Sequence, residues 1–108
     1  MSTLAPLRVL RNLTQLYEHG FQDKVTDAVL LRVAKSQMAR DRAALRDLKR
    51  DLYDFEQQYQ LNSVEFFQRW QAGEMDDTAD FMEWNALYQM ALDVRERLQL
   101  LQSEAKTQ

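Results

Sequence analysis

The feature that most constrains this chain is the near absence of residues that interrupt helices. Its 108 residues include two glycines and one proline, and none of the three lies between residues 24 and 60. Glycine and proline supply most tight turns, so a chain with so few of them favours long helices joined by few connections. The stretch 24–60 also consists mostly of strong helix formers. The sequence therefore predicts an all-α protein.

Signals for helix starts and stops divide the chain into four predicted helices within a single domain over residues 1–108. Thr3 and Asp23 are residue types that cap helix N-termini, and Asp76 or Asp77 is expected to cap the last helix. Gly20 supplies the left-handed conformation that commonly closes a helix, and a second glycine does so for the third helix. The predicted helices are 3–20, 23–60, 63–73 and 77–104.

Two of these helices carry apolar residues at alternating spacings of three and four, which is the pattern of a coiled-coil seam. In the second helix Asp41 interrupts a seam of Met38, Leu45, Leu48, Leu52, Phe55 and Tyr59. The seam of the last helix contains Trp84, Leu87, Ala91, Val94, Leu98, Leu101 and Ala105. Two seams of similar length predict an antiparallel, coiled-coil-like hairpin with a short helix at its tip. Ion pairs four residues apart are expected on the outer faces, between Arg50 and Asp54 and between Asp93 and Arg97.

The residue types that catalysis and metal binding require are nearly absent. The chain has no cysteine, and its one histidine, His19, precedes Gly20 and is interpreted as a helix-capping residue. No phosphate-binding loop, metalloprotease motif or nucleophile elbow occurs. The acids near residue 80 match no calcium-loop spacing and suit a helix N-terminus. We expect no enzyme activity, no cofactor and no metal.

Composition and charge indicate the expected location and partners of the chain. The lack of cysteine fits a reducing cytoplasm, and no apolar run is long enough for a membrane helix. Residues 32–50 hold seven bases and two acids, a net charge of +5, whereas residues 74–83 hold five acids and no base. With a net charge of −3 for the chain, nucleic acid is a disfavoured partner. The minor alternative is nucleic-acid contact through Arg40, Arg42, Arg46 and Arg50.

Aromatic residues and methionines concentrate around the predicted hairpin tip. This density is typical of interface anchors, although a short helix also needs its own apolar cover. The candidate anchors for a protein partner are Phe66, Trp70, Met75, Phe81 and Tyr88. The acids Asp76, Asp77, Asp80 and Glu83 would supply charge complementarity, for example to the basic substrate groove of an RNA-cleaving toxin.

The start of the second helix is apolar on more than one face, so it needs two neighbours. The first helix can cover only one of these apolar faces. A second copy of the chain is the alternative cover, through Val25, Val29, Leu30 and Val33. The rival hypothesis is thus a self-assembling scaffold, with a homodimer as its simplest form.

About half the chain, from Tyr59 to Leu101, carries a pattern of specific residues. They are Phe55 and Glu56, just before this stretch, and Tyr59; Ser63, Glu65 and Phe66; Ala72, Gly73 and Glu74; Asp80, Phe81, Glu83, Trp84, Leu87, Tyr88 and Met90; and Arg95, Glu96, Arg97 and Leu98. In these residues the chain resembles a family of small helical bacterial and cyanobacterial proteins that look like the antitoxin partners of TumE-type toxins. The resemblance implies a protein-binding module that neutralises a toxin encoded nearby. Met75 followed by Asp76 and Asp77 departs from the glycine and aspartate that often follow this Gly-Glu pair.

Overall fold

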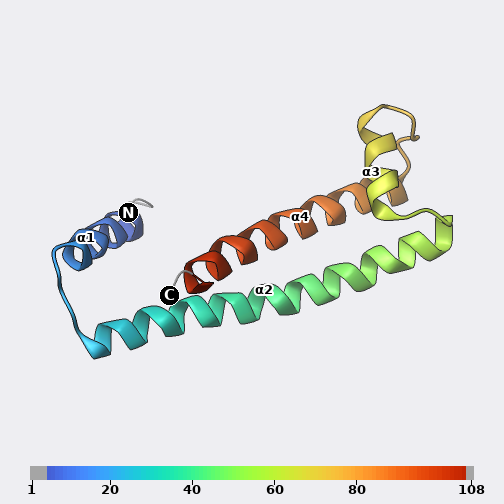
Figure 1. The fold of residues 1–108 in the computed structure, drawn as a ribbon. Helices are drawn as coiled ribbons and strands as arrows, with labels where there is room; N and C mark the ends of the chain where they lie inside the picture. Colours follow the sequence, from blue (N-terminus) through green and yellow to red (C-terminus); the bar gives the residue numbers. More distant parts are fainter. Residues whose placement is uncertain (1–4, 107–108) are drawn as a thin grey trace. The chain divides into compact units, whose positions relative to one another are not determined.

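The computed structural model describes residues 5–106, and the side chains of residues 5–102. Within this range it contains four α-helices and no strand, which confirms the all-α prediction (Figure 1). The helices are α1, Ala5–Glu18; α2, Lys24–Tyr59; α3, Ser63–Gln71; and α4, Ala79–Lys106. Their bounds differ from the predicted ones by up to two residues. The predicted cap Thr3 lies outside the described residues.

The chain divides into two compact units, Met1–Val33 and Ala34–Gln108, while the single domain stays a prediction. The boundary falls inside α2. Burial differs sharply between the units, because no residue of α1 is buried while the buried residues of α2 all follow residue 34. The first unit therefore has no apolar core among its described residues.

In the first unit, α1 ends in the backbone motif that its glycine predicted. Gly20 has a φ of +98°, and its N–H donates to the carbonyl of Tyr17 at 3.0 Å. The N–H of Phe21 donates to the carbonyl of Leu16 at 3.2 Å, which completes a Schellman motif. His19 lies in this cap, with Nδ1 2.7 Å from the carbonyl oxygen of Gln15.

Two side-chain hydrogen bonds order the start of α2. Asp23 accepts from the backbone N–H of Thr26 at 3.0 Å, as its predicted role of N-cap requires. The hydroxyl of Tyr17 donates to Asp27 at 2.6 Å. This bond to a carboxylate raises the pKa of Tyr17 to about 12, because it stabilises the protonated phenol.

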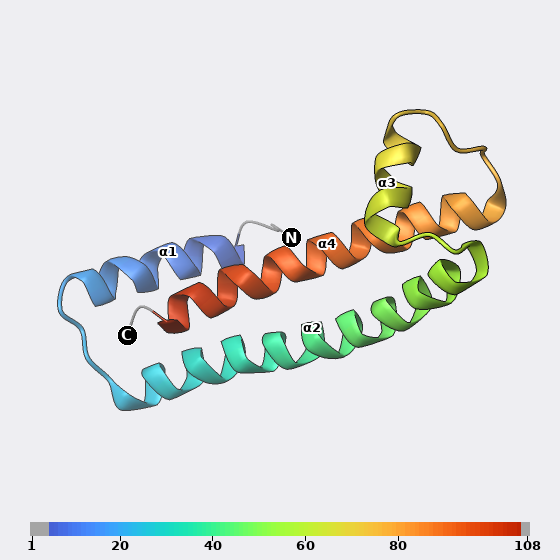
Figure 2. The same cartoon turned by 45° about the vertical axis from the view of Figure 1, so that its right-hand side comes forward.

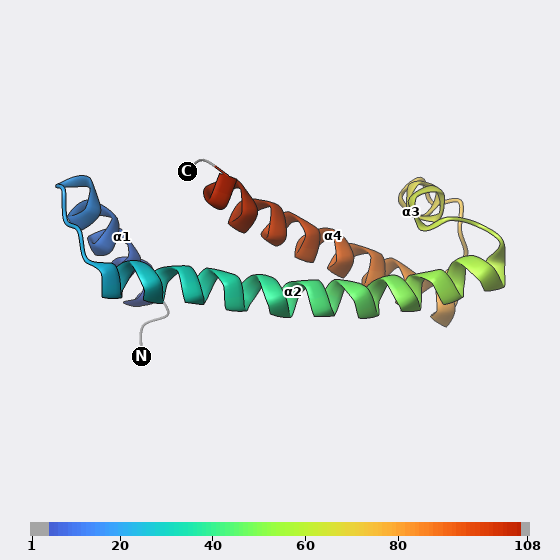
Figure 3. The ribbon, with the colours of Figure 1, turned by 60° about the horizontal axis from the view of Figure 1, so that its bottom comes forward.

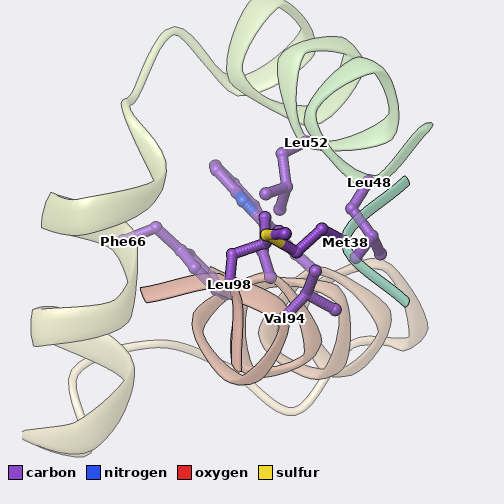
Figure 4. Packing of buried hydrophobic residues seen from close by; sticks show 8 residues of the cluster. Met38, Leu48, Leu52, Phe66, Val94 and Leu98 are labelled. Atoms are coloured by element: carbon purple, nitrogen blue, oxygen red, sulfur yellow. The ribbon is translucent and has the colours of Figure 1, made fainter. Parts of the chain in front are cut away.

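The second unit is the predicted antiparallel hairpin. From residue 34 onward α2 runs beside α4 in the opposite direction, and α3 crosses the end where they are joined (Figures 1 and 2). Figure 3 shows the same antiparallel course from another side. The buried side chains come from α2, α3 and α4 and point toward one another (Figure 4). They are Met38, Leu48, Leu52, Phe66, Trp84, Ala91, Val94 and Leu98.

This core follows the two predicted seams closely. Leu45, Phe55, Leu87 and Leu101 pack against it as half-buried members. Tyr59 ends the first seam with 36% of its surface exposed. The side chain of the last predicted seam residue, at position 105, lies outside the described side chains.

The interruption of the first seam is filled by an ion pair between the two long helices. Asp41 is buried, with 2% of its surface exposed, and accepts two hydrogen bonds from Arg97: from Nε at 2.9 Å and from Nη2 at 2.8 Å. Gln37 donates a third at 3.0 Å. The guanidinium of Arg97 holds the pKa of Asp41 below its ordinary value.

Both predicted surface ion pairs were wrong in their partners. Arg97 pairs with Asp41 of the facing helix instead of with Asp93, because a buried carboxylate needs a charged donor more than an exposed one does. Arg50 pairs at 3.0 Å with Asp47, three residues before it, instead of with Asp54. Only the first difference bears on the fold, since the side chains of the second pair are mostly exposed.

Candidate functional site

The hairpin tip is built from the end of α2, helix α3 and the start of α4, and its first turn is set by backbone conformation. Gln60 has a φ of +52°, and the next N–H, that of Leu61, donates to the carbonyl of Glu56 at 3.2 Å. This closes α2 in the same way that Gly20 closes α1. Asn62 then caps α3 by accepting from the N–H of Glu65 at 2.8 Å. Three residues thereby connect α2 to α3.

A stack of aromatic rings fixes α3 to the hairpin. The ring of Phe66 lies parallel to the indole of Trp84, with 3.9 Å between their centroids and 2° between their planes. Phe55 stacks on the same indole at 5.6 Å. The indole N–H donates to the hydroxyl of Ser63 at 2.9 Å, so the polar atom of a fully buried side chain is satisfied.

This stack changes the role of one predicted anchor. Phe66 was expected to contact a partner, yet its exposed surface is 0%. It belongs to the core because α3, at nine residues, is too short to be stable without a large apolar contact of its own. A partner can therefore contact Phe66 only if the tip opens.

The other predicted anchors lie between the core and solvent. Trp70, Met75, Phe81 and Tyr88 are all half-buried and pack against the core. The three aromatic rings among them also contact aromatic neighbours. Phe81 lies 5.0 Å from Tyr59, Trp70 lies 5.9 Å from Phe66, and Tyr88 lies 4.9 Å from Phe67. Part of each side chain is therefore available at the surface.

A groove at the tip brings two of these anchors together. Its lining includes the apolar side chains of Tyr59, Leu61, Met75 and Phe81. Its polar lining includes Glu65 and Arg69, which form an ion pair within α3. The groove thus places a few apolar side chains among a larger number of polar ones. Trp70 and Tyr88 are not part of it.

The predicted acidic residues separate into two groups. Asp76, Asp77 and Glu83 are exposed, and their carboxylates have no hydrogen-bond or ion-pair partner among the described residues. Asp80 is half-buried and accepts a hydrogen bond from the hydroxyl of Tyr59, which raises the pKa of that phenol. The first three carboxylates are available to a partner, whereas Asp80 links α4 to α2.

The predicted cap of α4 was wrong. Neither Asp76 nor Asp77 caps this helix, because it begins two residues later than expected and the cap is Thr78. The hydroxyl of Thr78 accepts from the N–H of Phe81 at 3.1 Å. Asp76 and Asp77, which the sequence predicted as helix caps, therefore have no hydrogen-bond partner among the described residues.

The residues predicted for self-association lie in the first unit. Val25, Val29 and Val33 are 71%, 53% and 62% exposed, and Leu30 is half-buried. Exposed apolar side chains continue on α1, at Leu7, Val9, Leu10 and Leu16. Apolar side chains exposed along both helical segments form the kind of surface that marks an interaction site.

The remaining chemistry of the described residues is limited. They contain no group of three His, Cys, Asp or Glu side chains placed to hold a metal ion. No helix in the described part of the chain is long and apolar enough to cross a membrane. Comparison of the chain with protein-family models, with curated proteins and with solved structures gave no match.

Proposed function

We propose that this chain is an antitoxin-like protein-binding module of the cytoplasm, which masks a toxin through the hairpin tip and the start of α4. The observation that carries the proposal is the set of three unpaired carboxylates, of Asp76, Asp77 and Glu83, near the groove that contains Met75 and Phe81. The resemblance to antitoxin partners of TumE-type toxins covers the same part of the chain and supports the same function.

The charge of the tip indicates the chemistry of the partner surface. Residues 74–83 contain five acids and no base, so the tip attracts a basic surface and repels an acidic one. Such complementarity raises the association rate and selects the partner, while partly buried aromatic side chains supply affinity. The expected partner is therefore a toxin with a basic groove, and the half-buried anchors are Trp70, Met75, Phe81 and Tyr88.

The test begins with a tagged pull-down from the native host, followed by mass spectrometry, and the recovered partner is then purified. The triple variant Asp76→Lys, Asp77→Lys, Glu83→Lys is expected to weaken binding of that partner by at least about 100-fold, because like charges then face each other. Isothermal titration calorimetry measures the change. Expression of the partner alone is expected to stop growth, and co-expression of the wild-type chain to restore it.

The matched control makes the same change of charge at three exposed acids further from the tip, Asp47→Lys, Asp51→Lys and Glu96→Lys. It is expected to bind within a few-fold of wild type. Equal loss of binding in both triple variants would show that net charge alone matters, and the tip would not be the site. A partner whose expression does not impair growth would contradict the antitoxin function but leave the binding surface standing.

A second candidate function, a self-assembling scaffold, is favoured by the exposed valines of the first unit. We expect Val29→Asp or Leu30→Asp to convert an oligomer into a monomer, because a charge in an apolar interface loses its hydration. Light scattering coupled to gel filtration measures the mass. Met90→Asp, at an exposed apolar position of α4, is the control and should leave the mass unchanged. A monomeric wild-type chain would rule this function out.

A further inference from the structure

A basic stripe follows one side of α2 within the second unit. Lys35, Arg42, Arg46 and Lys49 are separated by seven, four and three residues, and Tyr53 continues the series four residues later. At about 100° per residue, these five positions fall within an arc of about 60° on the helix. We call these five residues the basic stripe. All five are exposed.

The bases of the stripe differ from their neighbours in having no partner. Lys35, Arg42, Arg46 and Lys49 make no side-chain hydrogen bond or ion pair with any described residue. Two other arginines of the same helix are engaged. Arg40 donates to Ser36 and Gln37, and Arg50 pairs with Asp47.

The sequence alone indicated a different set of bases on this helix. The minor alternative from it was nucleic-acid contact through Arg40, Arg42, Arg46 and Arg50, which do not share one face of the helix. The structure retains Arg42 and Arg46 from that group, because Arg40 and Arg50 are bonded within the helix. Lys35 and Lys49 join them through their helical register.

The net negative charge of the chain does not cancel this surface. Among the acids of residues 74–83, Asp80 lies at the last turn of α2, where Tyr59 donates to it, and Arg46 is thirteen residues before Tyr59. At 1.5 Å per residue the separation is about 20 Å, roughly twice the distance over which physiological salt screens a charge. The stripe therefore presents a local positive potential even though the net charge is −3.

The composition of the stripe fits nucleic acid better than protein. A protein interface of useful affinity needs buried apolar or aromatic anchors among its charges. Here the half-buried Leu45 lines a groove together with Arg42, Arg46 and Lys49, and it is the only apolar residue in the lining of that groove. Tyr53 stands at one end with 57% of its surface exposed. A row of bases that ends in an exposed aromatic ring matches the phosphate track and stacking platform of single-strand binding sites.

We propose that the basic stripe binds single-stranded nucleic acid, with Lys35, Arg42, Arg46 and Lys49 on successive phosphates and Tyr53 stacked on a base. This site is separate from the hairpin tip, and it does not depend on the antitoxin-like function.

Fluorescence anisotropy with a labelled 20-nucleotide single-stranded RNA tests the site. Four phosphate contacts predict that the logarithm of the binding constant falls with the logarithm of salt concentration with a slope of about −2.8. The double variant Arg42→Gln, Arg46→Gln should reduce that slope to about −1.4, since two contacts are lost. Tyr53→Ala should weaken binding severalfold without a change of slope, and Tyr53→Phe should restore it.

The matched control is Arg40→Gln with Arg50→Gln, which removes the same charge from the same helix and should leave the slope near −2.8. All these positions are exposed, and circular dichroism is expected to show the wild-type helix content. Absence of binding at low salt, or equal losses in both double variants, would overturn the proposal. Displacement of the RNA by a lower concentration of polyglutamate would also overturn it, because the stripe would then favour acidic protein.

Discussion

Replacement of Trp84 by alanine is expected to lower the free energy of unfolding by about 3–5 kcal/mol. The indole is fully buried, stacks on Phe66 and Phe55, and donates to Ser63. Its removal leaves a cavity where all three helices of the second unit meet. Urea denaturation followed by circular dichroism measures the loss.

Two further variants separate the contributions to this effect. Trp84→Phe keeps an aromatic ring in the stack but removes the hydrogen bond to Ser63, so a smaller loss is expected, of which about 1 kcal/mol belongs to the hydrogen bond. Met90→Ala, on an exposed side of the same helix, should change stability by no more than about 0.5 kcal/mol. If Trp84→Ala were no more destabilising than Met90→Ala, the described core would be wrong.

The second large effect is expected at the ion pair that joins α2 and α4. Arg97→Leu should strongly destabilise the hairpin, because it leaves the buried carboxylate of Asp41 without its charged donor. The double variant Asp41→Leu, Arg97→Leu should recover much of that loss, since leucine continues the apolar seam. Arg50→Leu, which breaks an exposed pair, is the matched control and should have little effect. A double variant less stable than Arg97→Leu alone would contradict this account.

The same pair should make stability depend on acid pH. The pKa of Asp41 is lowered in the folded chain by Arg97, so its contribution is complete above the unfolded value of 3.8. That contribution is lost as pH falls below 3.8 through the folded pKa. The double leucine variant should lose stability less steeply in that range. Some dependence should remain from Asp23, whose pKa is lowered by its hydrogen bonds with Thr26.

The elements of the fold were predictable because they depend on local signals. The two seams, the glycine at residue 20 and the cap at Asp23 each act within a few residues, and the structure has all of them. The turn at Gln60 was harder to predict, since its positive φ occurs at a residue other than glycine. The antiparallel hairpin followed from the seams because two apolar stripes on one short chain can bury each other.

The candidate site was less predictable because contacts between helices decide which of its residues are buried in the core and which remain at the surface. The sequence places Phe66 and Phe81 in one aromatic group, but only the packing of α3 on Trp84 shows that the first is core. The partners of Asp41 and Asp80 are 56 and 21 residues away. A carboxylate at a seam position was the available signal for a buried ion pair, and the sequence offered no signal for its partner.

Because the tip and the hairpin share one core, the lifetime of this protein depends on whether a ligand is bound at the tip. The same stack of Phe55, Phe66 and Trp84 that holds α3 in place also closes α2 on α4, so local opening of the tip weakens the whole hairpin. A ligand that binds only the closed tip adds about 2.7 kcal/mol to its stability when present at 100 times its dissociation constant. Proteases that cleave opened chains therefore remove unoccupied molecules first, so the proposed partner is expected to protect this protein from degradation.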